Sequence, residues 1–404
     1  MTASNGARML ALVLLAWALS APRARAAEPA CELEGVDRIV AIGDVHGAHD
    51  RLVSILRLAG LVDHRQRWSG GKTHLVQLGD VVDRGPDSRK VLDLLRRLEG
   101  QAAKAGGAVH TLLGNHEVMR MSGDRRYVTP GEYKAFVTPR SEEVRALFVR
   151  GATPEAREAI LEDTPLGWIE MQAAFGPQGT YGKWLRARNS VLRINGVIFL
   201  HGGISPAVAG LSCGEINAAV RRDIAGDLQP GGLPPESLAR REDGPLWYRG
   251  LAGEPEDTFA ASLQQILEKQ KARAIVIGHT VAPEGRVRAR FEGRVFQIDT
   301  GMQAGYVPTG RASALEIRGG AFTALYEDGQ ERLATISETS ACTGQSSSGR
   351  CPWMSHHATV SDSLEAATGA TDRGEPAVHH DLDHLAVTWS TASGTSVLLS
   401  NSIR

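Results

Sequence analysis

The chain of 404 residues has few cysteines, almost no net charge and, after its first 26 residues, no long apolar run. Its 45 basic and 46 acidic residues give a formal net charge of −1. Because the basic residues are scattered and form no long run, nucleic acid is not expected as a partner. The hydrophobic content of 42% allows a full-sized core, in one large domain or two smaller ones.

The only long apolar stretch is "MLALVLLAWALS" (9–20), near the N-terminus. It follows Arg8, is too short to span a bilayer comfortably, and precedes Ala24 and Ala26, which supply a small-x-small cleavage box. We expect residues 1–26 to be a secretory signal peptide, with a retained membrane anchor as the alternative. No later run reaches about 18 apolar residues. The mature chain is therefore expected to be a periplasmic or secreted monomer that does not bind the membrane.

The four cysteines, Cys31, Cys213, Cys342 and Cys351, form an even set with three possible pairings. Cys342 and Cys351 are close in sequence and could close a small loop. None stands in a CxxC motif, which disfavours a zinc-thiolate site. None follows the glycine-flanked apolar runs described below, which disfavours a nucleophilic cysteine. Structural disulfides or idle thiols are the favoured interpretation.

The sequence does contain apolar runs that end in glycine and a polar, metal-competent residue. Such runs are typical of buried strands, and they alternate with helical patterns at 48–59, 86–99 and 258–271, which predicts a layered α/β domain. Strand signals lie at 38–43, 74–78, 108–113, 196–200, 273–277 and 294–298. The runs read "RIVAIGDVHG" (38–47), "HLVQLGDVVDRG" (74–85), "VHTLLGNHE" (109–117), "VIFLHGG" (197–203) and "AIVIGHT" (274–280).

Two further segments differ in character from this core. About 80 residues between the third and fourth predicted strands carry short helical patterns, and we expect a helical cap at about 120–190. From 338 to 404 the chain is rich in Ser, Thr, Ala and Gly with little periodicity, which predicts a disordered tail. The core domain is expected to span 27–337.

The polar residues after these runs can meet at one edge of the sheets, because sites in open α/β sheets form outside the carboxyl ends of strands. Singly, each residue is better explained as a turn residue or a satisfied histidine. Together, five strand ends with carboxylate, amide or imidazole groups favour a site for Mn, Fe or Zn. One carboxylate that bridges two cations would explain the number of ligands. The candidates are Asp44, His46, Asp80, Asn115, His201 and His279.

In this order, "GDVHG", "GDVVDRG", "GNHE", "HGG" and "GHT" resemble the motifs of the calcineurin-like metallophosphoesterases, and within them the phosphoprotein phosphatase superfamily. The segments "YGKWLRARNSVLRINGVIFLHGGIS" and "DGPLWYRG" are most similar to the Shewanella-like protein phosphatases. The resemblance covers about 36–327. It implies two facing mixed β-sheets flanked by helices, a four-layer α/β sandwich, with a dinuclear metal centre at the strand ends.

The family pattern gives roles to the candidate residues. Asp44 and His46 would bind the first cation, Asp80 would bridge, and Asn115, His201 and His279 would bind the second. The cations would be manganese, with iron or zinc possible. Many metallophosphoesterases have a second histidine after the last motif, but Thr280 and Val281 follow here, as in phosphoprotein phosphatases. The first cation should therefore have fewer protein ligands and more water.

The mechanism expected from this resemblance is direct attack by a hydroxide. Two cations roughly 3.5 to 4 Å apart lower the pKa of a bridging water and leave a hydroxide aimed at phosphorus. His116 would protonate the leaving oxygen, and Asp83 would accept a hydrogen bond from its ring. Arg84 and Arg249 would bind the phosphate as forked donors, and Asn115 would also contact the substrate.

These observations predict a metal-dependent phosphomonoesterase that acts on phosphoprotein, with phosphoserine, phosphothreonine and phosphotyrosine all left open. A symmetrical dinucleoside tetraphosphate hydrolase shares the motifs and is the alternative, but its substrates are cytosolic. An inactive homologue that only binds metal is disfavoured because every ligand and His116 are present.

Overall fold

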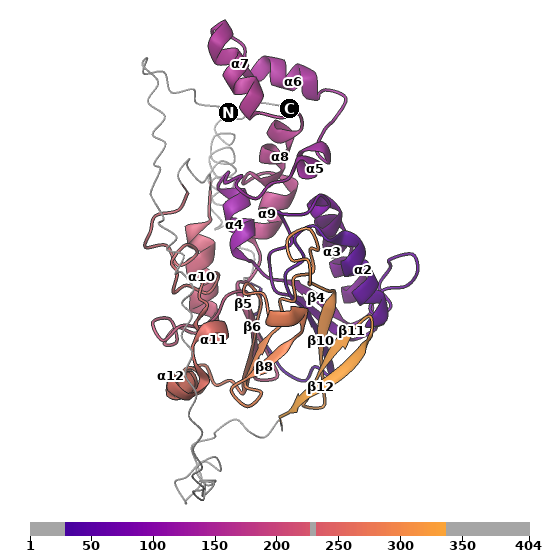
Figure 1. The fold of residues 1–404 in the computed structure, drawn as a ribbon, viewed down its shortest axis with the longest axis vertical. Helices are drawn as coiled ribbons and strands as arrows, with labels where there is room; N and C mark the ends of the chain where they lie inside the picture. Colours follow the sequence, from indigo (N-terminus) through magenta and orange to yellow (C-terminus); the bar gives the residue numbers. More distant parts are fainter. Residues whose placement is uncertain (1–28, 227–231, 337–404) are drawn as a thin grey trace, which may run out of the picture. The chain divides into compact units, whose positions relative to one another are not determined.

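Two six-stranded mixed sheets form the centre of the molecule (Figure 1). The computed structural model describes residues 29–226 and 232–336, so the expected signal peptide and the expected tail lie outside the described residues. The first sheet has the order β1 (Glu32–Leu33), β5 (Val191–Ile194), β6 (Val197–Leu200), β7 (Ala274–Ile277), β9 (Val295–Gln297), β8 (Arg288–Arg290). The second has the order β12 (Gly329–Thr335), β11 (Ala321–Tyr326), β10 (Ser313–Arg318), β2 (Arg38–Ile42), β3 (His74–Gln77), β4 (Ala108–Thr111). The expected fold class is confirmed.

The strands that carry the candidate ligands run parallel to one another within each sheet. β2 pairs with β3 and β3 with β4, while β6 pairs with β7 and β7 with β9, all in parallel register. The carboxyl ends of each parallel set therefore lie at one edge of its sheet. The antiparallel partners β10, β11 and β12 extend the second sheet on the other side of β2.

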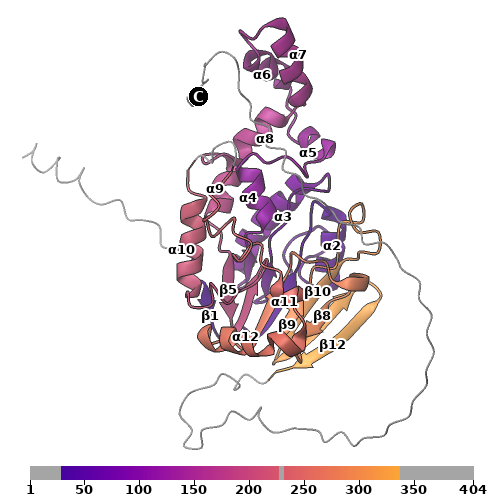
Figure 2. The ribbon, with the colours of Figure 1, turned by 60° about the vertical axis from the view of Figure 1, so that its left-hand side comes forward.

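Each sheet is covered by helices on its outer face. α2 (His49–Leu58) contacts β11 and α3 (Ser88–Lys104) contacts β4, while α10 (Cys213–Asp223) contacts β5. In both views α2 and α3 lie on one side of the sheets, and α10 and α12 (Glu256–Lys269) on the other, with the short α11 (Gly250–Gly253) near α12 (Figures 1 and 2). The layers are thus helix, sheet, sheet, helix.

Strand β2 shows why the sequence reads as a continuous apolar run. Ile39 and Ala41 belong to an apolar cluster that lies between the two sheets and contains no helix residue. Val40 and Ile42 belong to the other cluster, which also contains the buried residues of the helices. Successive side chains of a strand point to opposite faces, so both faces of β2 are buried. A strand buried on both faces needs apolar residues at every position, which accounts for the unbroken apolar run in the sequence.

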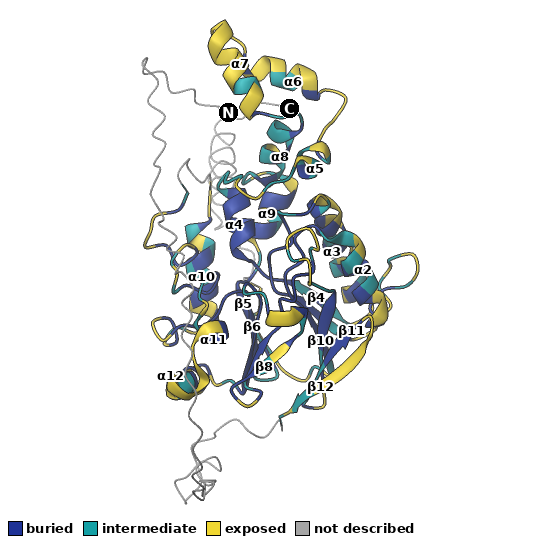
Figure 3. Cartoon of the chain, in the orientation of Figure 1, coloured by how far each residue is buried: buried dark blue, intermediate teal, exposed yellow. Residues whose placement is uncertain are grey.

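The chain between β4 and β5 is helical. It contains α4 (Asn115–Met121), α5 (Pro130–Lys134), α6 (Ser141–Phe148), α7 (Pro154–Asp163), α8 (Trp168–Phe175) and α9 (Thr180–Arg186). α4 begins directly at a candidate ligand and is buried throughout, whereas α7 has no buried residue and much of α6 is exposed (Figure 3). Among the described residues, no helix is both long and apolar enough to cross a membrane.

A disulfide joins Cys31 to Cys213, which are 182 residues apart. It links the residue before β1 to the first residue of α10, next to the backbone hydrogen bond from Arg193 N to Cys31 O of 2.7 Å. The sequence left the pairing open. Cys342 and Cys351 lie outside the described residues.

Replacing both Cys31 and Cys213 by serine should lower the free energy of unfolding by about 2 to 5 kcal/mol, because the bond restricts a long loop of the unfolded chain. Denaturant unfolding without reductant measures the difference. The wild-type protein with dithiothreitol should shift toward the unfolding midpoint of the double variant. A wild-type midpoint that does not respond to reductant would show that the bond adds nothing to stability.

Candidate metal centre

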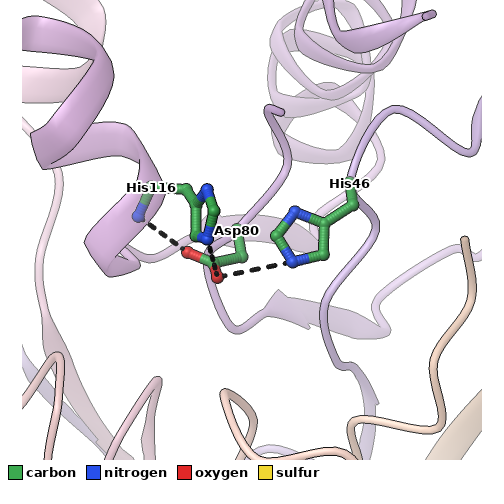
Figure 4. Close-up of side chains that lie close together, drawn as sticks. All are labelled: His46, Asp80 and His116. Atoms are coloured by element: carbon green, nitrogen blue, oxygen red, sulfur yellow. Dashed lines mark hydrogen bonds and ion pairs between the residues drawn. The ribbon is translucent and has the colours of Figure 1, made fainter. Parts of the chain in front are cut away.

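The ends of five strands meet around one carboxylate oxygen, Oδ2 of Asp80. This atom lies 3.6 Å from Nε2 of His46, 3.8 Å from Nε2 of His116 and 3.3 Å from Nε2 of His201. Figure 4 shows the rings of His46 and His116 on either side of the Asp80 carboxylate, each directed toward it. Asp80 follows β3, and the three histidines follow β2, β4 and β6, so both sheets contribute to the cluster.

The remaining candidates lie in the same cluster. Nε2 of His201 is 2.9 Å from Oδ1 of Asn115 and 3.1 Å from Nδ1 of His279. Oδ2 of Asp44 is 3.9 Å from Nε2 of His46, and its Oδ1 accepts a hydrogen bond of 3.0 Å from the backbone N–H of His279. All six predicted ligands are brought together, and each side chain is buried.

Two groups of ligand atoms are compact enough to hold a cation each. The atoms of His46, Asp80 and His116 lie within 4.8 Å of one another, and so do those of Asp80, His201 and His279. Asp80 belongs to both groups, as expected of a bridging carboxylate. Among the described residues these are the only such groups of histidine, cysteine and carboxylate side chains.

The imidazoles are oriented for metal binding by backbone carbonyls. Nδ1 of His46 is 2.8 Å from Val82 O, and Nδ1 of His201 is 3.0 Å from Leu78 O. A proton on Nδ1 satisfies each carbonyl and leaves Nε2 as a free lone pair that faces oxygen atoms, an arrangement that a cation stabilises. Nε2 of His279 is buried and has no hydrogen-bond partner among the described residues. The residues present therefore fit a metal centre.

The electrostatics of the site also favour cations. Burial and the neighbouring charges of Asp299 and Asp80 raise the pKa of Asp44 well above its ordinary value. Burial likewise raises the pKa of Asp299 to about 6, with a further contribution from Asp80. The repulsion between these buried carboxylates is relieved by a positive ion. Burial lowers the pKa of His46 to about 4, which keeps its imidazole in the neutral form that binds metal.

The backbone around the site is strained. Five of the predicted site residues have a left-handed φ between 47° and 70°, namely His46, Asp80, Asp83, Arg84 and His279. Such a conformation in a residue other than glycine costs about 1 to 3 kcal/mol and persists where the surrounding structure enforces it. The left-handed conformation changes the direction of the chain directly after the strand, at the residues whose side chains form the cluster.

Two glycines of the motifs are required by the close approach of the carboxylates. A Cβ at Gly278 would lie 2.5 Å from Oδ1 of Asp44, and a Cβ at Gly114 would overlap Oδ1 of Asp80. Glycine therefore precedes His279 and Asn115 because the site leaves no room for another side chain.

His116 contacts two other residues predicted to take part in catalysis, Asp83 and Arg84. Its Nδ1 is 2.7 Å from Oδ2 of Asp83, and its Nε2 is 3.4 Å from Nη2 of Arg84. Burial alone would lower the pKa of His116, but the charge of Asp80 and the hydrogen bond to Asp83 raise it above the ordinary value. The two carboxylates thus favour the protonated form of the ring, which can act as an acid.

The metal-ligand cluster and the residues beside it line one cavity of about 270 Å³. Arg84 and Arg249 both line it, together with Asn115 and His116, whereas Asp83 and His201 lie behind its wall. Nη1 of Arg249 donates to His279 O at 3.1 Å and to Oγ1 of Thr280 at 2.9 Å, which anchors this arginine beside the cluster.

Residues 37–283 match the family of calcineurin-like phosphoesterases, and this span contains every candidate ligand. The chain belongs to the calcineurin-like phosphoesterases. Its described fold, with two mixed sheets and flanking helices, agrees with this assignment.

Individual members of this family are similar to the chain over most of its length. Shewanella-like protein phosphatase 2 of Arabidopsis thaliana is 30% identical over 302 residues, which is 70% of this chain and 76% of the relative. Shewanella-like protein phosphatase 1 of Plasmodium berghei is 30% identical over 66% of this chain and 67% of its own. The crystal structure of a cold-active protein-tyrosine phosphatase of a psychrophilic Shewanella species superposes with a TM-score of 0.61 at 30% identity, covering 76% of this chain and 83% of that one.

The phosphoesterase also matches, over a shorter stretch, a relative whose name gives a different activity. The symmetrical bis(5'-nucleosyl)-tetraphosphatase of Escherichia coli is 38% identical over only 77 residues, which is 19% of this chain and 22% of the relative.

Sequence reasoning missed several residues at the centre of this phosphoesterase. Asp299 follows β9, is buried, and accepts a 2.9 Å hydrogen bond from Gly301 N. The strand at 294–298 was predicted, so the position after it was a candidate. Asp299 does not fit the pattern of the other ligands, because the glycine lies two residues after it, at Gly301, instead of directly before it. Tyr127, which was not predicted, lines the cavity with its ring centroid 5.0 Å from the guanidinium of Arg84. Tyr306, which the sequence suggested could approach the cations but which was given no role, also lines it, with its ring centroid 3.6 Å from the same guanidinium.

Proposed function

We propose that this calcineurin-like phosphoesterase is an exported phosphatase that hydrolyses phosphoprotein with two divalent cations. The observation that carries the proposal is the sharing of Asp80 by two buried ligand groups, one of which includes His116, the histidine that is hydrogen-bonded to Asp83. The relatives that match most of the chain are named protein phosphatases, which supports a phosphoprotein substrate.

We assign the cation-binding residues as follows. Asp44 and His46 would hold one cation, Asn115, His201 and His279 the other, and Asp80 both. Carboxylate, amide and imidazole ligands suit manganese, iron or zinc, and we propose manganese first. Two bound cations would supply Lewis acidity that activates water and neutralises phosphate oxygens.

Nε2 of His116 lies close enough to Asp80 for this histidine to be a metal ligand as well. A ligand must present a lone pair, but the charge of Asp80 and the bond to Asp83 favour protonation of this ring. The ring also lines the cavity, where a leaving oxygen can reach it. We therefore assign His116 as the general acid and Asp83 as the residue that orients it.

The arginines are placed to bind the phosphate. Arg84 lines the cavity beside His116, and Arg249 lines it beside His279. Each guanidinium offers forked donors that match two phosphate oxygens. The rings of Tyr127 and Tyr306, which are 41% and 48% exposed, offer apolar surface at the mouth to the side chain that carries the phosphate.

Export is supported by the leader-like N-terminus and by the Cys31–Cys213 disulfide, since structural disulfides persist in oxidising compartments. The dinucleoside tetraphosphate alternative has less support, because the corresponding match covers only 19% of the chain. A protein that binds metal without turnover has less support as well, because His116, Asp83 and both arginines are in place.

The protein, stripped of metal and reloaded with Mn²⁺, Fe²⁺ or Zn²⁺, should release phosphate from phosphotyrosine and phosphoserine peptides, and EDTA should abolish the release. Dinucleoside tetraphosphate should be a poor substrate in the same assay. Rapid cleavage of the dinucleotide with inert phosphopeptides would favour the alternative. Metal-loaded protein that turns over neither substrate would contradict catalysis altogether.

A further inference from the structure

Arg120 is a fully buried cation next to the proposed catalytic pair, and the proposed function gives it no role. Its side chain is only 1% exposed. It lies on α4 four residues after His116, so the two side chains project from the same face of the helix. Burial alone would lower the pKa of Arg120, but the charges of Asp83 and Glu132 raise it, so the guanidinium is charged.

His116 and Arg120 bind different oxygens of one carboxylate. Nδ1 of His116 lies 2.7 Å from Oδ2 of Asp83, while Nη2 of Arg120 donates to Oδ1. Two residues of α4 therefore bind the Asp83 carboxylate, one at each oxygen, and both contacts oppose its rotation. Without Arg120 the carboxylate could turn about its Cβ–Cγ bond and carry the imidazole with it.

The helical insertion fixes Arg120 in turn. Its Nη2 donates to Oε1 of Glu132 on α5 at 3.0 Å, and its Nη1 lies 2.9 Å from the sulfur of Met171 on α8. Glu132 is itself buried and also accepts hydrogen bonds from Asp83 N at 3.2 Å and from Oγ of Ser88 at 2.6 Å. The same glutamate thus holds the guanidinium and the backbone of Asp83.

The backbone of this turn needs such support, because Asp83 and Arg84 are consecutive residues with φ of 70° and 65°. The insertion supplies it twice. Glu132 accepts from Asp83 N, and Tyr127 O accepts from Arg84 N at 2.8 Å. The chain between β4 and β5 therefore contacts both residues of this turn, Asp83 through the buried Glu132 and Arg84 through the backbone of Tyr127.

We propose that Arg120, held by Glu132, is a positioning residue that fixes the Asp83 carboxylate and thereby aims the His116 ring at the leaving oxygen. The inference rests on the proposed function, because it concerns the rate of phosphoester hydrolysis. It assigns the helical insertion a part in catalysis. A structural role alone would affect stability without regard to the leaving group.

The test compares leaving groups in the full-length, metal-loaded protein. We define the leaving-group ratio as kcat/KM for 4-nitrophenyl phosphate divided by kcat/KM for a phosphoserine peptide. A misdirected acid slows the alkyl ester, whose oxygen needs a proton, far more than the nitrophenyl ester. Arg120→Met combined with Glu132→Gln removes one positive and one negative charge, so no unpaired buried charge is created. The ratio should rise about tenfold, since small misplacements of a catalytic group cost up to about 10² in rate.

Three comparisons make the result specific. In the Asp83→Asn variant, adding the same double substitution should not change the ratio further from that of Asp83→Asn alone, because Arg120 acts through Asp83. Arg120→Lys keeps the charge but cannot span Asp83 and Glu132, so it should raise the ratio by a smaller factor, and it decides the question should the double variant not fold. Arg188→Met with Glu99→Gln makes the same change of charge at a partly buried ion pair that has no contact with the site, and should leave the ratio within about twofold.

An unchanged ratio in every folded Arg120 variant, with normal metal content, overturns the inference. The proposed function can fail separately. A wild-type protein that hydrolyses neither ester with metal bound contradicts both, whereas a raised ratio in His116→Asn alongside unaltered Arg120 variants contradicts the inference alone.

Discussion

Replacing Asp80 by asparagine should remove bound metal and lower phosphatase activity by at least about 10³-fold. Oδ2 of Asp80 lies within 3.8 Å of three imidazole nitrogens, and among the described residues Asp80 is the one residue that belongs to both ligand groups. Asparagine has nearly the same shape but no negative charge, and it presents an N–H₂ group to one side of the cluster. Neither cation would keep its bridging ligand.

The fold should survive this substitution, because the apolar strands determine it. Oδ1 of residue 80 would still accept the hydrogen bond from His116 N, which is 3.0 Å long in the wild-type protein. Metal content by elemental analysis, phosphate release and thermal unfolding of metal-free protein measure the three effects. Asp63→Asn, in an exposed turn away from the site, is the matched control and should retain metal and activity. Near-normal turnover of Asp80→Asn with two metals bound would exclude a bridging role.

The ligand positions could be predicted because each follows a predicted strand, and several of these strands are apolar runs buried on both faces. Strands such as β2 and β7 read as strands at every residue, and parallel neighbours end at a common edge. The sequence could not give the order of the strands, since β1 pairs with β5 across about 160 residues of chain. That pairing depends on the packing of the whole domain.

The C-terminal strands β10, β11 and β12 were not predicted, although the sequence carried their turn signals. Gly319 and Gly320 separate β10 from β11, while Glu327 and Asp328 separate β11 from β12, which begins at Gly329. Gly-Gly and Asp-Gly pairs between alternating apolar residues are strong hairpin signals. None of these strands is followed by the glycine and metal-competent residue that mark the strands of the site, so the motif pattern did not include them.

The second layer of the site was harder to predict than the first. Arg120 could have been found from its spacing of four to His116 on a helix, but nothing in the sequence places Glu132 opposite it. Glu132 reaches Asp83 only because the segment after α4 turns back across the loop that follows β3. Contacts of this kind depend on loop paths, which local sequence does not specify.

The proposed acid role of His116 predicts a loss of rate that depends on the leaving group. A proton delivered to the departing oxygen matters most when that oxygen would leave as a strongly basic alkoxide, and least when it leaves as a nitrophenolate. His116→Asn should therefore slow hydrolysis of a phosphoserine peptide by about 10² to 10⁴, with a clearly smaller effect on 4-nitrophenyl phosphate. Asp83→Asn should show the same pattern more weakly, because it orients the ring without touching the substrate.

Two controls separate this role from others. His110→Asn changes a histidine that pairs with His74 between β3 and β4, outside the cavity, and should leave both rates unchanged. Arg249→Ala should slow both substrates alike, because it contacts the phosphoryl group that they share. The geometry offers His116 one other role, since its Nε2 lies 3.8 Å from Asp80 and within one of the two ligand groups. If His116→Asn slows both esters equally and also loses metal, the ring is a ligand; if it slows them equally with metal retained, the ring positions the phosphate.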